Sequence, residues 1–342
     1  MNYHLIIPIA IFVIIILLWL WAWKLTNTPY GKTTLMVGLI FKFLSIVNPG
    51  GKQSVKKMRR DADFNSKISQ GKRKKMYEIL DISIPIDDVS IKARIYKPQE
   101  KENMPLIVFY HGGGWVVCGL HTHDALCRYL AYKTGFIVMS VDYRLAPEYK
   151  YPTAADDSFA ALEWIAANGK SMDIDTSRIS VCGDSAGGNI AAVMCFKAKE
   201  KGFPSLVSQA LLYPAVDLAH TNTESYQFFS KGYGLTMDDM ENFRALYMNN
   251  EEEWLHSDVS PLLASDHSGL PPAIVITCGF DVLRDEGELY ATKLKNSGVE
   301  VKLIRFEKMF HGFMCTGGLI KDAWKASDEV AEFILNKSCT QI

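Results

Sequence analysis

Short apolar runs alternate with segments of helical periodicity from residue 76 onward. Continuous apolar runs at 105–110 (PLIVFY) and 136–141 (FIVMSV) are typical of strands that are buried on both faces of a parallel sheet. Residues 154–167 then show a helical period. The alternation predicts an α/β fold with a mostly parallel central sheet and helices on both faces. The other predicted strands are 82–86, 91–96, 179–182, 210–213, 273–277 and 301–306, and the other predicted helices are 190–201, 287–296 and 323–335.

Residues 221–256 interrupt this alternation. The segment is polar but rich in aromatic side chains. We interpret it as an insertion that folds over the C-terminal edge of the sheet. Its aromatic residues include Tyr226, Phe228, Phe229, Tyr233, Phe243 and Tyr247.

The N-terminus carries an uncharged apolar run at residues 5–23 (LIIPIAIFVIIILLWLWAW). A helix of this length spans roughly 28 Å, which is close to the thickness of the hydrocarbon core of a bilayer. Trp19, Trp21 and Trp23 lie at its C-terminal end, where indole rings favour the membrane interface. A cleaved signal peptide is the rival interpretation, but no Lys or Arg precedes the run and no A-x-A site follows it. The sequence therefore predicts a retained single-pass anchor over residues 1–23.

Residues 24–75 form a strongly basic segment after this run. They contain 13 Lys and Arg against Asp61 and Asp63, a net charge of +11 in a chain whose overall net charge is −1. Positive charge on the C-terminal side of a span predicts that this side, and hence the body of the protein, faces the cytoplasm. Residues 35–47 are apolar but too short to span. We expect them to lie in the membrane interface or to cover part of a substrate pocket.

The composition of the chain is that of an ordinary globular protein. Hydrophobic residues make up 48% of the 342 residues and charged residues 22%, which excludes a disordered chain. The seven cysteines are an odd number without C-x-x-C spacing, and most lie in apolar runs. This pattern favours reduced, buried thiols over a disulfide scaffold or a zinc ribbon.

The sequence Gly183-Asp184-Ser185-Ala186-Gly187 matches G-x-S-x-G. Three fixed residues are a weak signal alone, and a glycine-rich strand end is the alternative interpretation. The context is more specific, because a predicted strand precedes the motif and a helix follows it, as in a nucleophile elbow. Such a turn exposes the hydroxyl of its serine, so we predict Ser185 as the nucleophile.

A serine hydroxyl needs a base that takes its proton, and the chain order in folds with this elbow is serine, acid, histidine. His311 comes just after the last predicted strand and therefore follows any acid. The other histidines after Ser185 come before the strand whose end should carry the acid; they are His220, His256 and His267. We predict His311 as the base, with a core histidine between phenylalanines as the alternative.

Two aspartates compete for the role of the acid. Asp281 lies just beyond the predicted strand 273–277, at the sheet edge from which His311 can be reached. Asp285, with Glu286, suits the first turn of the next helix, where negative charge is favoured by the helix dipole. We predict Asp281 as the acid that holds the tautomer of the imidazole and stabilises the imidazolium.

The sequence His111-Gly112-Gly113-Gly114 follows another predicted strand. Consecutive glycines let backbone N–H groups converge on one point, as in the HGGG-type loop of lipases and esterases. The N–H groups of Gly113, Gly114 and Ala186 are candidates for an oxyanion hole, with His111 and Gly112 as supporting residues of the loop. A phosphate-binding loop is the alternative, but no Lys-Ser/Thr pair follows.

The sequence His121-Thr122-His123-Asp124 contains residue types that bind metal ions. We interpret it instead as a surface helix start that is capped by a polar residue. We therefore expect no metal ion there.

Five motifs together resemble the hormone-sensitive-lipase family of α/β-hydrolases. They are HGGGW at 111–115, DYRLAPE at 142–148, GDSAGG at 183–188, DVLRDE at 281–286 and FHGF at 310–313. The resemblance covers about residues 76–337, and the N-terminal anchor is similar to that of the arylacetamide deacetylase branch. The resemblance implies the α/β-hydrolase fold with a helical cap, ester hydrolysis without a cofactor, and the same triad and oxyanion hole. Val282 departs from the proline that is frequent in the family, which loosens the turn but leaves the acid in place.

The expected function is that of a membrane-anchored serine esterase or lipase that forms a covalent acyl-enzyme. An arylacetamide-type amide deacetylase is one alternative, and a non-catalytic small-molecule receptor on the same fold is another. The expected partners are a small-molecule or lipid ester and a membrane, and no nucleic acid. The expected domains are an anchor (1–23), a basic juxtamembrane or cap segment (24–75) and a hydrolase domain (76–342). Vertebrate members of the resembling branch face the lumen, whereas the charge pattern here predicts the cytoplasmic side.

Overall fold

The computed structural model describes the backbone of residues 3–47 and 53–339 and the side chains of residues 14–45 and 53–339. Residues 5–13 of the predicted anchor and Lys52 of the basic segment therefore lie outside the described side chains. Within the described residues, no helix is both long and apolar enough to cross a membrane.

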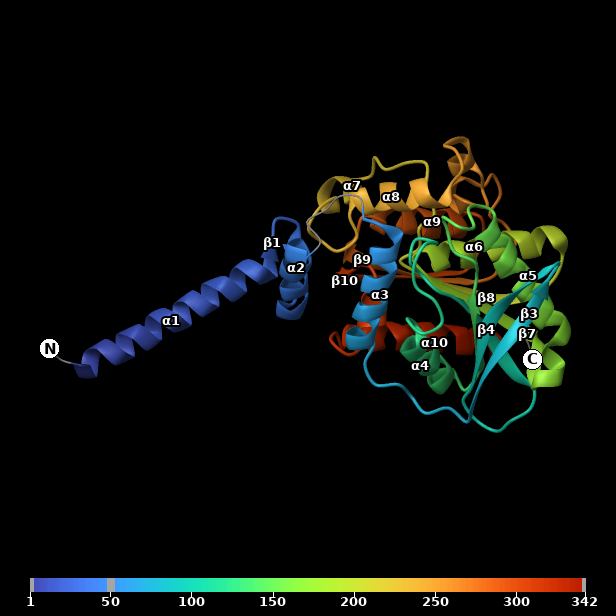
Figure 1. The fold of residues 1–342 in the computed structure, drawn as a ribbon, viewed down its shortest axis with the longest axis horizontal. Coiled ribbons are helices and arrows are strands. Elements are labelled where there is room, and N and C mark those ends of the chain that lie inside the picture. The colour runs from blue at the N-terminus through green and yellow to red at the C-terminus, as the bar shows by residue number, and fades with distance from the viewer. Residues whose placement is uncertain (1–2, 48–52, 340–342) are drawn as a thin grey trace.

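An eight-stranded sheet forms the centre of the protein (Figure 1). Its strand order is β10-β9-β8-β7-β5-β6-β4-β3. The strands from β10 to β6 pair in parallel, and β4 and β3 join antiparallel at one edge. The prediction of a mostly parallel sheet is confirmed. The strands are β3 (Glu78–Ile86), β4 (Val89–Lys97), β5 (Met104–Tyr110), β6 (Ile137–Asp142), β7 (Ile174–Asp184), β8 (Leu206–Leu212), β9 (Ala273–Phe280) and β10 (Val301–Phe310).

Helices cover both faces of this sheet, as the alternating pattern predicts (Figure 1). Helices α4 and α10 contact each other on one face, and α5, α6 and α9 lie on the other. The helices are α4 (Asp124–Thr134), α5 (Thr153–Asn168), α6 (Ala186–Lys201), α9 (Arg284–Asn296) and α10 (Asp322–Cys339). Short 3₁₀ turns lie between them at η1 (Gly169–Met172), η3 (Pro261–Leu263) and η4 (Phe313–Thr316).

The burial of each strand follows its position in the sheet. Every residue of the central strand β5 is buried, and so is every residue of β9. The edge strand β10 alternates between less and more exposed positions over most of its length. Central parallel strands are covered by helices on both faces, which is why they were visible in the sequence as continuous apolar runs.

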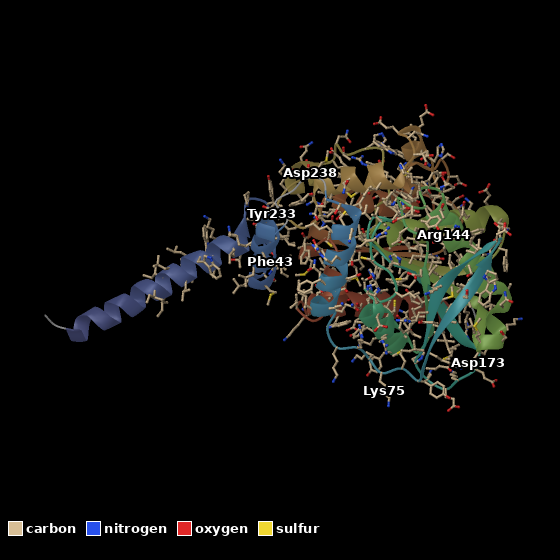
Figure 2. The ribbon with its side chains drawn as sticks, in the orientation of Figure 1. Phe43, Lys75, Arg144, Asp173, Tyr233 and Asp238 are labelled. Atoms are coloured by element: carbon tan, nitrogen blue, oxygen red, sulfur yellow. The ribbon has the colours of Figure 1, made fainter. Side chains whose placement is uncertain are left out.

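The N-terminal elements extend from one side of the body, where α1 projects outward and α2 lies between α1 and the body (Figure 1). Helix α2 buries Val37 and Phe41. The ring of Phe41 packs edge-on against rings of Tyr233, Phe280 and Phe310, with centroids 5.2, 5.8 and 5.8 Å away. Figure 2 shows Tyr233 and the exposed Phe43 at this junction. The elements are α1 (Tyr3–Thr26), β1 (Asn27–Thr28), β2 (Gly31–Lys32), α2 (Leu35–Val47) and α3 (Val55–Ser69).

Residues 221–256 form helices above the sheet (Figure 1). They are α7 (Glu224–Phe229), α8 (Met237–Tyr247) and the 3₁₀ turn η2 (Glu252–Leu255). Helix α8 starts with a capping box, in which Thr236 and Asp239 each bond the backbone N–H of the other. The same helix presents Phe243 to the glycine loop, because a Cβ added to Gly114 would lie 2.3 Å from the Phe243 ring.

Helix α3 is tied to the body by polar contacts. Arg59 donates from Nε to Val116 O at 2.9 Å and from a terminal nitrogen to Ala146 O at 3.0 Å. It also forms a two-point ion pair with Glu148. Arginine has the planar fork that such paired contacts require, so α3 is held beside the loop that follows β5.

The prediction that a helix starts at residues 121–124 is confirmed, but the prediction that this start lies at the surface with a polar cap is wrong. Helix α4 does begin at Asp124, but His123 and Asp124 are both buried and the His123 side chain makes no cap hydrogen bond. Ion pairs and a hydrogen bond offset the burial of the Asp124 carboxylate. Its partners are Arg73, Arg94, Arg128 and Tyr96. Arg73, Arg94 and Tyr96 come from other segments, so the local sequence reveals only Arg128, which lies one turn further along α4.

The seven cysteines are all free. The prediction of buried thiols is confirmed for four of them, namely Cys127, Cys182, Cys195 and Cys278. It is wrong for Cys339, which is exposed, and for Cys118 and Cys315, which are partly exposed. The last two thiols line a cavity that also contains Ser185.

Candidate active site

Ser185 stands in a tight turn between β7 and α6. Its backbone has φ +57° and ψ −120°, a positive φ that is strained for a residue with a side chain. A Cβ added to Gly183 would lie 2.1 Å from the carbonyl oxygen of Gly187, and one added to Gly187 would lie 2.0 Å from that of Tyr110. Close backbone packing therefore requires both glycines of the motif, and the resulting turn leaves Ser185 on the wall of a cavity.

The structure brings Ser185, His311 and Asp281 together at the carboxyl edge of the sheet. His311 Nε2 lies 2.8 Å from Ser185 Oγ, and His311 Nδ1 lies 2.8 Å from Asp281 Oδ2. Strands β9 and β10 are parallel neighbours, so the residues that follow their carboxyl ends meet at one edge. The other carboxylate oxygen of Asp281 accepts a hydrogen bond from Leu283 N at 3.0 Å, which fixes the buried carboxylate.

These contacts define the tautomer of His311. An ionised carboxylate only accepts hydrogen bonds, so the Nδ1–H of His311 donates to Asp281. The neutral ring then presents the lone pair of Nε2 to the hydroxyl of Ser185. The arrangement can take a proton from Ser185 without a change in the position of the imidazole.

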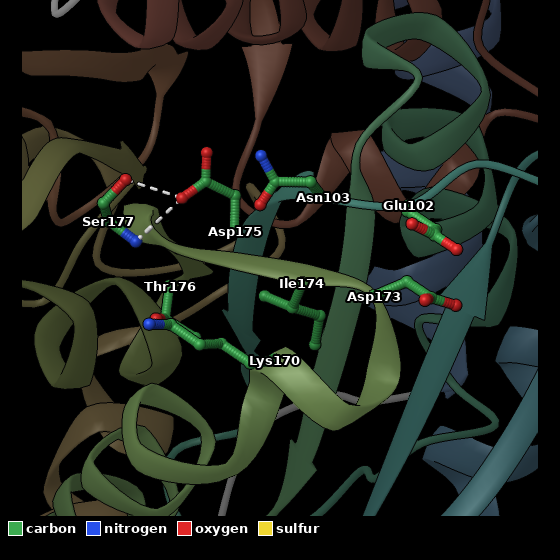
Figure 3. Close-up of a pocket in the computed structure, with 8 residues that line it drawn as sticks. All are labelled: Glu102, Asn103, Lys170, Asp173, Ile174, Asp175, Thr176 and Ser177. Carbon is green, nitrogen blue, oxygen red and sulfur yellow. Dashed lines mark hydrogen bonds between the residues drawn. The ribbon is translucent and has the colours of Figure 1, made fainter.

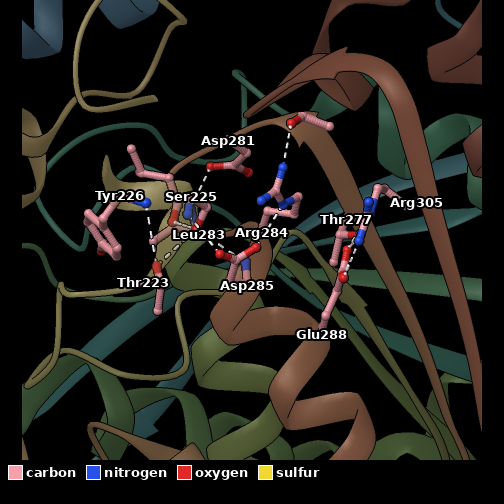
Figure 4. Close-up of polar contacts among 12 residues, drawn as sticks. Thr223, Ser225, Tyr226, Thr277, Asp281, Leu283, Arg284, Asp285, Glu288 and Arg305 are labelled. Carbon is pink, nitrogen blue, oxygen red and sulfur yellow. Dashed lines mark hydrogen bonds and ion pairs between the residues drawn. The ribbon is translucent and has the colours of Figure 1, made fainter. Parts of the chain in front are cut away.

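Asp285 serves a different set of contacts (Figure 4). Its Oδ2 accepts from Ser225 N at 2.7 Å, and its Oδ1 pairs with Arg284 Nε at 2.7 Å. It lies in the first turn of α9 together with Glu286. Of the two aspartates that the sequence left in competition, Asp281 is the one that the structure brings to His311.

The glycine loop after β5 lies on the wall of the same cavity as Ser185. Gly113 has φ +116° and Gly114 has φ +58°, backbone conformations that favour glycine. Within the described residues, no acceptor is bonded to the N–H of Gly113 or of Gly114. Ala186 is the first residue of α6, where N–H groups have no partner within the helix. Three N–H donors therefore border the position of Ser185 and remain available to a ligand.

His111 supports this loop as a neutral residue. Its Nδ1 donates to Gly112 O at 2.8 Å, and its ring stacks on Tyr143 with centroids 4.3 Å apart. Burial, followed by the nearby charge of His123, lowers the pKa of His111 to about 4. The Tyr143 hydroxyl donates to His111 O at 2.6 Å, so the backbone before the glycines is fixed as well.

Asp184 also holds the glycine loop, although the sequence analysis did not single it out. Its Oδ1 accepts from Gly112 N at 2.8 Å and lies 3.0 Å from His123 Nε2. Burial acts to raise the pKa of Asp184, but the charge and hydrogen bond of His123 and the bond from Gly112 outweigh it and lower the pKa. The position beside the serine of G-x-S-x-G was the available signal. The partner His123 comes from a distant segment, which no local pattern indicates.

Two adjacent cavities lie at this site, and one of them has Ser185 in its wall. The first has a volume of about 280 Å³ and includes Ser185 and His311 in its wall. The second has a volume of about 430 Å³ and shares Ala62, Asn65 and Phe243 with the first. Its apolar wall residues include Phe43, Leu44, Met58, Phe64 and Val117. Residues of α2 and α3 therefore line a groove that continues from the serine, which fits the expectation that 35–47 covers part of a pocket.

A further hollow of about 540 Å³ lies at the opposite end of β7 (Figure 3). Two of the three carboxylates that line it, those of Asp173 and Asp175, have protein partners. Asp173 pairs with Lys97, and Asp175 accepts from Ser177 N at 3.0 Å and from Ser177 Oγ at 2.6 Å. The amino ends of the strands thus carry no cluster comparable to that of Ser185 among the residues that line this hollow.

The family of the chain follows from comparison with known proteins. Residues 107–315 match a family of proteins that have the alpha/beta hydrolase fold, and this stretch includes Ser185, Asp281 and His311. The chain belongs to the hormone-sensitive-lipase-like family of α/β-hydrolases. The match extends over more than half of the chain and includes most of β5 and all of β6, β7, β8, β9 and β10.

Several relatives of this α/β-hydrolase are esterases. It is 42% identical over 243 residues to the carboxylic ester hydrolase LipN of Mycobacterium tuberculosis, and the alignment covers 69% of this chain and 64% of that protein. It is 37% identical over 262 residues to an arylesterase of Saccharolobus solfataricus, with 72% and 84% covered. Among solved structures, an esterase of Pyrobaculum calidifontis superposes with a TM-score of 0.82 at 38% identity, covering 87% of this α/β-hydrolase and 96% of the esterase.

Proposed function

We infer that this chain is a carboxylic-ester hydrolase, and we propose that Ser185, His311 and Asp281 are its catalytic triad. The observation that carries the proposal is the continuous hydrogen-bonded series from Ser185 Oγ through His311 to Asp281, with both contacts at 2.8 Å. The esterases among the relatives and solved structures support the same reaction. A non-catalytic receptor on this fold would not need a complete hydrogen-bonded series of serine, histidine and aspartate.

The proposed reaction has two halves. Ser185 Oγ attacks the ester carbonyl while its proton passes to His311 Nε2, and the negative charge that develops on the carbonyl oxygen is stabilised by the N–H groups of Gly113, Gly114 and Ala186. His311 then protonates the departing alcohol, and the acyl group remains on Ser185. In the second half, water attacks the acyl-enzyme while it loses a proton to His311, and His311 returns this proton to Ser185 Oγ as the carboxylic acid is released. Asp281 holds the imidazole in place and stabilises its charged form.

The proposed substrate has an apolar acyl or alcohol group of moderate size. The groove of about 430 Å³ beyond the first cavity is lined largely by apolar side chains, and Phe64 contributes to it from α3. Burial of each methylene contributes about 0.8 kcal/mol, or roughly a fourfold gain in kcat/KM. Helix α3 and residues 221–256 act together as the cap over this groove.

We expect kcat/KM to rise from the acetate to the octanoate in a series of p-nitrophenyl esters, because the added methylenes enter the groove. Phe64→Ala should reduce this preference for longer chains. Ile68→Ala is the matched control, since Ile68 is also exposed on α3 but does not line the groove. A flat or falling kcat/KM along the series, or equal effects of the two variants, would refute the assignment of the groove.

We also propose that the protein is held at a membrane by its N-terminus, as in the arylacetamide deacetylase branch. The uncharged run at residues 5–23 supports this proposal. The described part of α1 keeps large apolar side chains away from the body, with Leu17, Trp19 and Trp23 all more than half exposed. The basic segment that follows suits a surface of anionic lipids on the cytoplasmic side.

Deletion of residues 1–23 should release the protein from membranes only in part. The basic segment 24–75 and the apolar helix α2 remain, and each basic residue near an anionic surface contributes at most about 1 kcal/mol. Residual binding of the truncated protein to vesicles should require anionic lipid and weaken with added salt. Salt-independent binding to neutral vesicles, or full-length protein that does not bind vesicles, would contradict the proposal.

Protease added outside intact cells should leave the body of the protein whole, because the body is expected on the cytoplasmic side. Digestion of the body under these conditions would show that it faces the opposite side of the membrane.

A further inference from the structure

A second cluster of reactive side chains, which includes Asp184, lines the same cavity as the nucleophile. His123, Asp184 and Cys315 each offer one ligand atom, and the three atoms lie within 4.8 Å of one another. His123 Nε2 is 3.0 Å from Asp184 Oδ1, and Cys315 Sγ is 4.0 Å from Asp184 Oδ2. The three residues come from the start of α4, the end of β7 and η4. All three line the cavity of about 280 Å³ that contains Ser185, so a small ion can reach them.

The hydrogen bonds of His123 orient its ring as a ligand. The hydroxyl of Thr122 donates to Gly119 O at 2.7 Å and accepts from Gly119 N at 3.0 Å. Because its only hydrogen is thus committed, Thr122 Oγ1 accepts from His123 Nδ1 at 2.9 Å. His123 Nε2 then faces the carboxylate of Asp184, where either a proton or a cation can join the two. A hydrogen bond from the second nitrogen of the ring is the usual support of a metal-binding histidine.

The donor set selects a class of cation. An imidazole nitrogen, a thiolate sulfur and a carboxylate oxygen suit Zn²⁺ and related ions, whereas Mg²⁺ and Ca²⁺ require oxygen ligands. Zinc lies about 2.0–2.3 Å from such ligands, so two ligand atoms of one ion are at most about 4.6 Å apart. The separations of 3.0 Å and 4.0 Å from the carboxylate of Asp184 fall within this limit, and small side-chain shifts would bring all three atoms around one ion. The charges of one carboxylate and one thiolate neutralise a divalent cation, so the occupied site is neutral although it is largely buried.

We propose that His123, Asp184 and Cys315 form a binding site for Zn²⁺ that inhibits the enzyme. On binding, the thiol proton of Cys315 and any proton on His123 Nε2 pass to solvent. The cation competes with Gly112 N–H for the carboxylate of Asp184, which displaces the glycine loop of the oxyanion hole. It also occupies the wall of the cavity beside Ser185. The inhibition rests on the proposed ester hydrolysis, whereas the binding of zinc does not.

The test measures binding and hydrolysis separately on the full, untagged chain after treatment with a chelator. We expect one Zn²⁺ per chain by calorimetry, and a thiolate-to-cobalt charge-transfer band when Co²⁺ is used as the probe. Hydrolysis of p-nitrophenyl butyrate should fall as Zn²⁺ fills the site and recover with the chelator. Mg²⁺ at the same concentration should have no effect.

Two cysteine variants locate the site. Cys315→Ser should weaken Zn²⁺ binding and inhibition at least tenfold and abolish the cobalt–thiolate band. Cys118→Ser is the matched control, because Cys118 lines the same cavity but is not part of the cluster, and it should bind Zn²⁺ as the parent does. Unchanged inhibition of Cys315→Ser by Zn²⁺ would assign the bound zinc to His311 and overturn the proposal. Loss of Zn²⁺ binding in Cys118→Ser would also overturn it. If the protein binds zinc through Cys315 but does not hydrolyse esters, the proposed function would be refuted and the proposed zinc site would stand.

Discussion

Replacement of Ser185 by alanine should reduce ester hydrolysis to the rate of the uncatalysed background. The alanine retains the backbone turn but has no hydroxyl to form the acyl-enzyme, so we expect a loss of about 10⁴–10⁶-fold in kcat. His311→Ala should cost a similar factor, because the hydroxyl at 2.8 Å from Nε2 then has no base. The double variant should be no worse than either single variant, since members of one triad act as a unit. The measurement is kcat on a p-nitrophenyl ester.

Thermal unfolding of Ser185→Ala serves as the control for this comparison. The side chain of Ser185 lies on the wall of a cavity and is only partly buried, so its removal should leave the unfolding midpoint nearly unchanged. A folded His311→Ala variant that keeps near-normal turnover would show that another group acts as the base.

Asp281→Asn should lower kcat by about 10⁴-fold, because an amide in this position favours the wrong tautomer of the histidine. Asp281 Oδ2 now accepts from His311 Nδ1, and an asparagine that turns its NH₂ toward the ring would leave the proton on Nε2. Nε2 would then be unable to take the proton of Ser185. The expected loss is therefore in kcat, with the folded structure retained.

Asp285→Asn is the matched control for this substitution. Asp285 bonds Ser225 N and Arg284, and an asparagine oxygen can still accept from the backbone (Figure 4). We expect kcat within a few-fold of the parent and a loss of stability of about 1 kcal/mol from the weakened ion pair and helix-dipole contact. A larger loss of kcat in Asp285→Asn than in Asp281→Asn would move the role of the acid to Asp285.

The features that could be predicted from the sequence are those that the fold imposes on a short stretch of neighbouring residues. Strand β5 is buried along its whole length, so its apolar run was visible without knowledge of its neighbours. His311 and Asp281 could be chosen by chain order, because parallel strands end at one edge and residues just beyond those ends meet there. Asp285 could be set aside because its position at the start of a helix already explained its charge.

Other features depend on contacts between distant segments and left no local signal. His123 was expected at the surface, yet it is buried because Asp184, far along the chain, pairs with it. Phe243, in segment 221–256, packs on Gly114. The sequence of this segment shows neither a strand period nor a helix period, so the direction of the Phe243 side chain could not be predicted. The groove formed with α2 and α3 likewise depends on tertiary packing, such as the contact of Arg59 with the loop after β5. For the same reason, the cluster of His123, Asp184 and Cys315 could not be anticipated.

Covalent labelling with a fluorophosphonate, followed by mass spectrometry of the intact chain and its peptides, tests the proposed reaction most directly. The probe phosphonylates a serine only where a base activates it and donors stabilise the oxyanion, which here means Ser185 with His311 and the glycine loop. We expect one adduct per chain, located on Ser185, and none on the Ser185→Ala variant. An adduct on another residue, or a folded protein that is not labelled at all, would contradict the account.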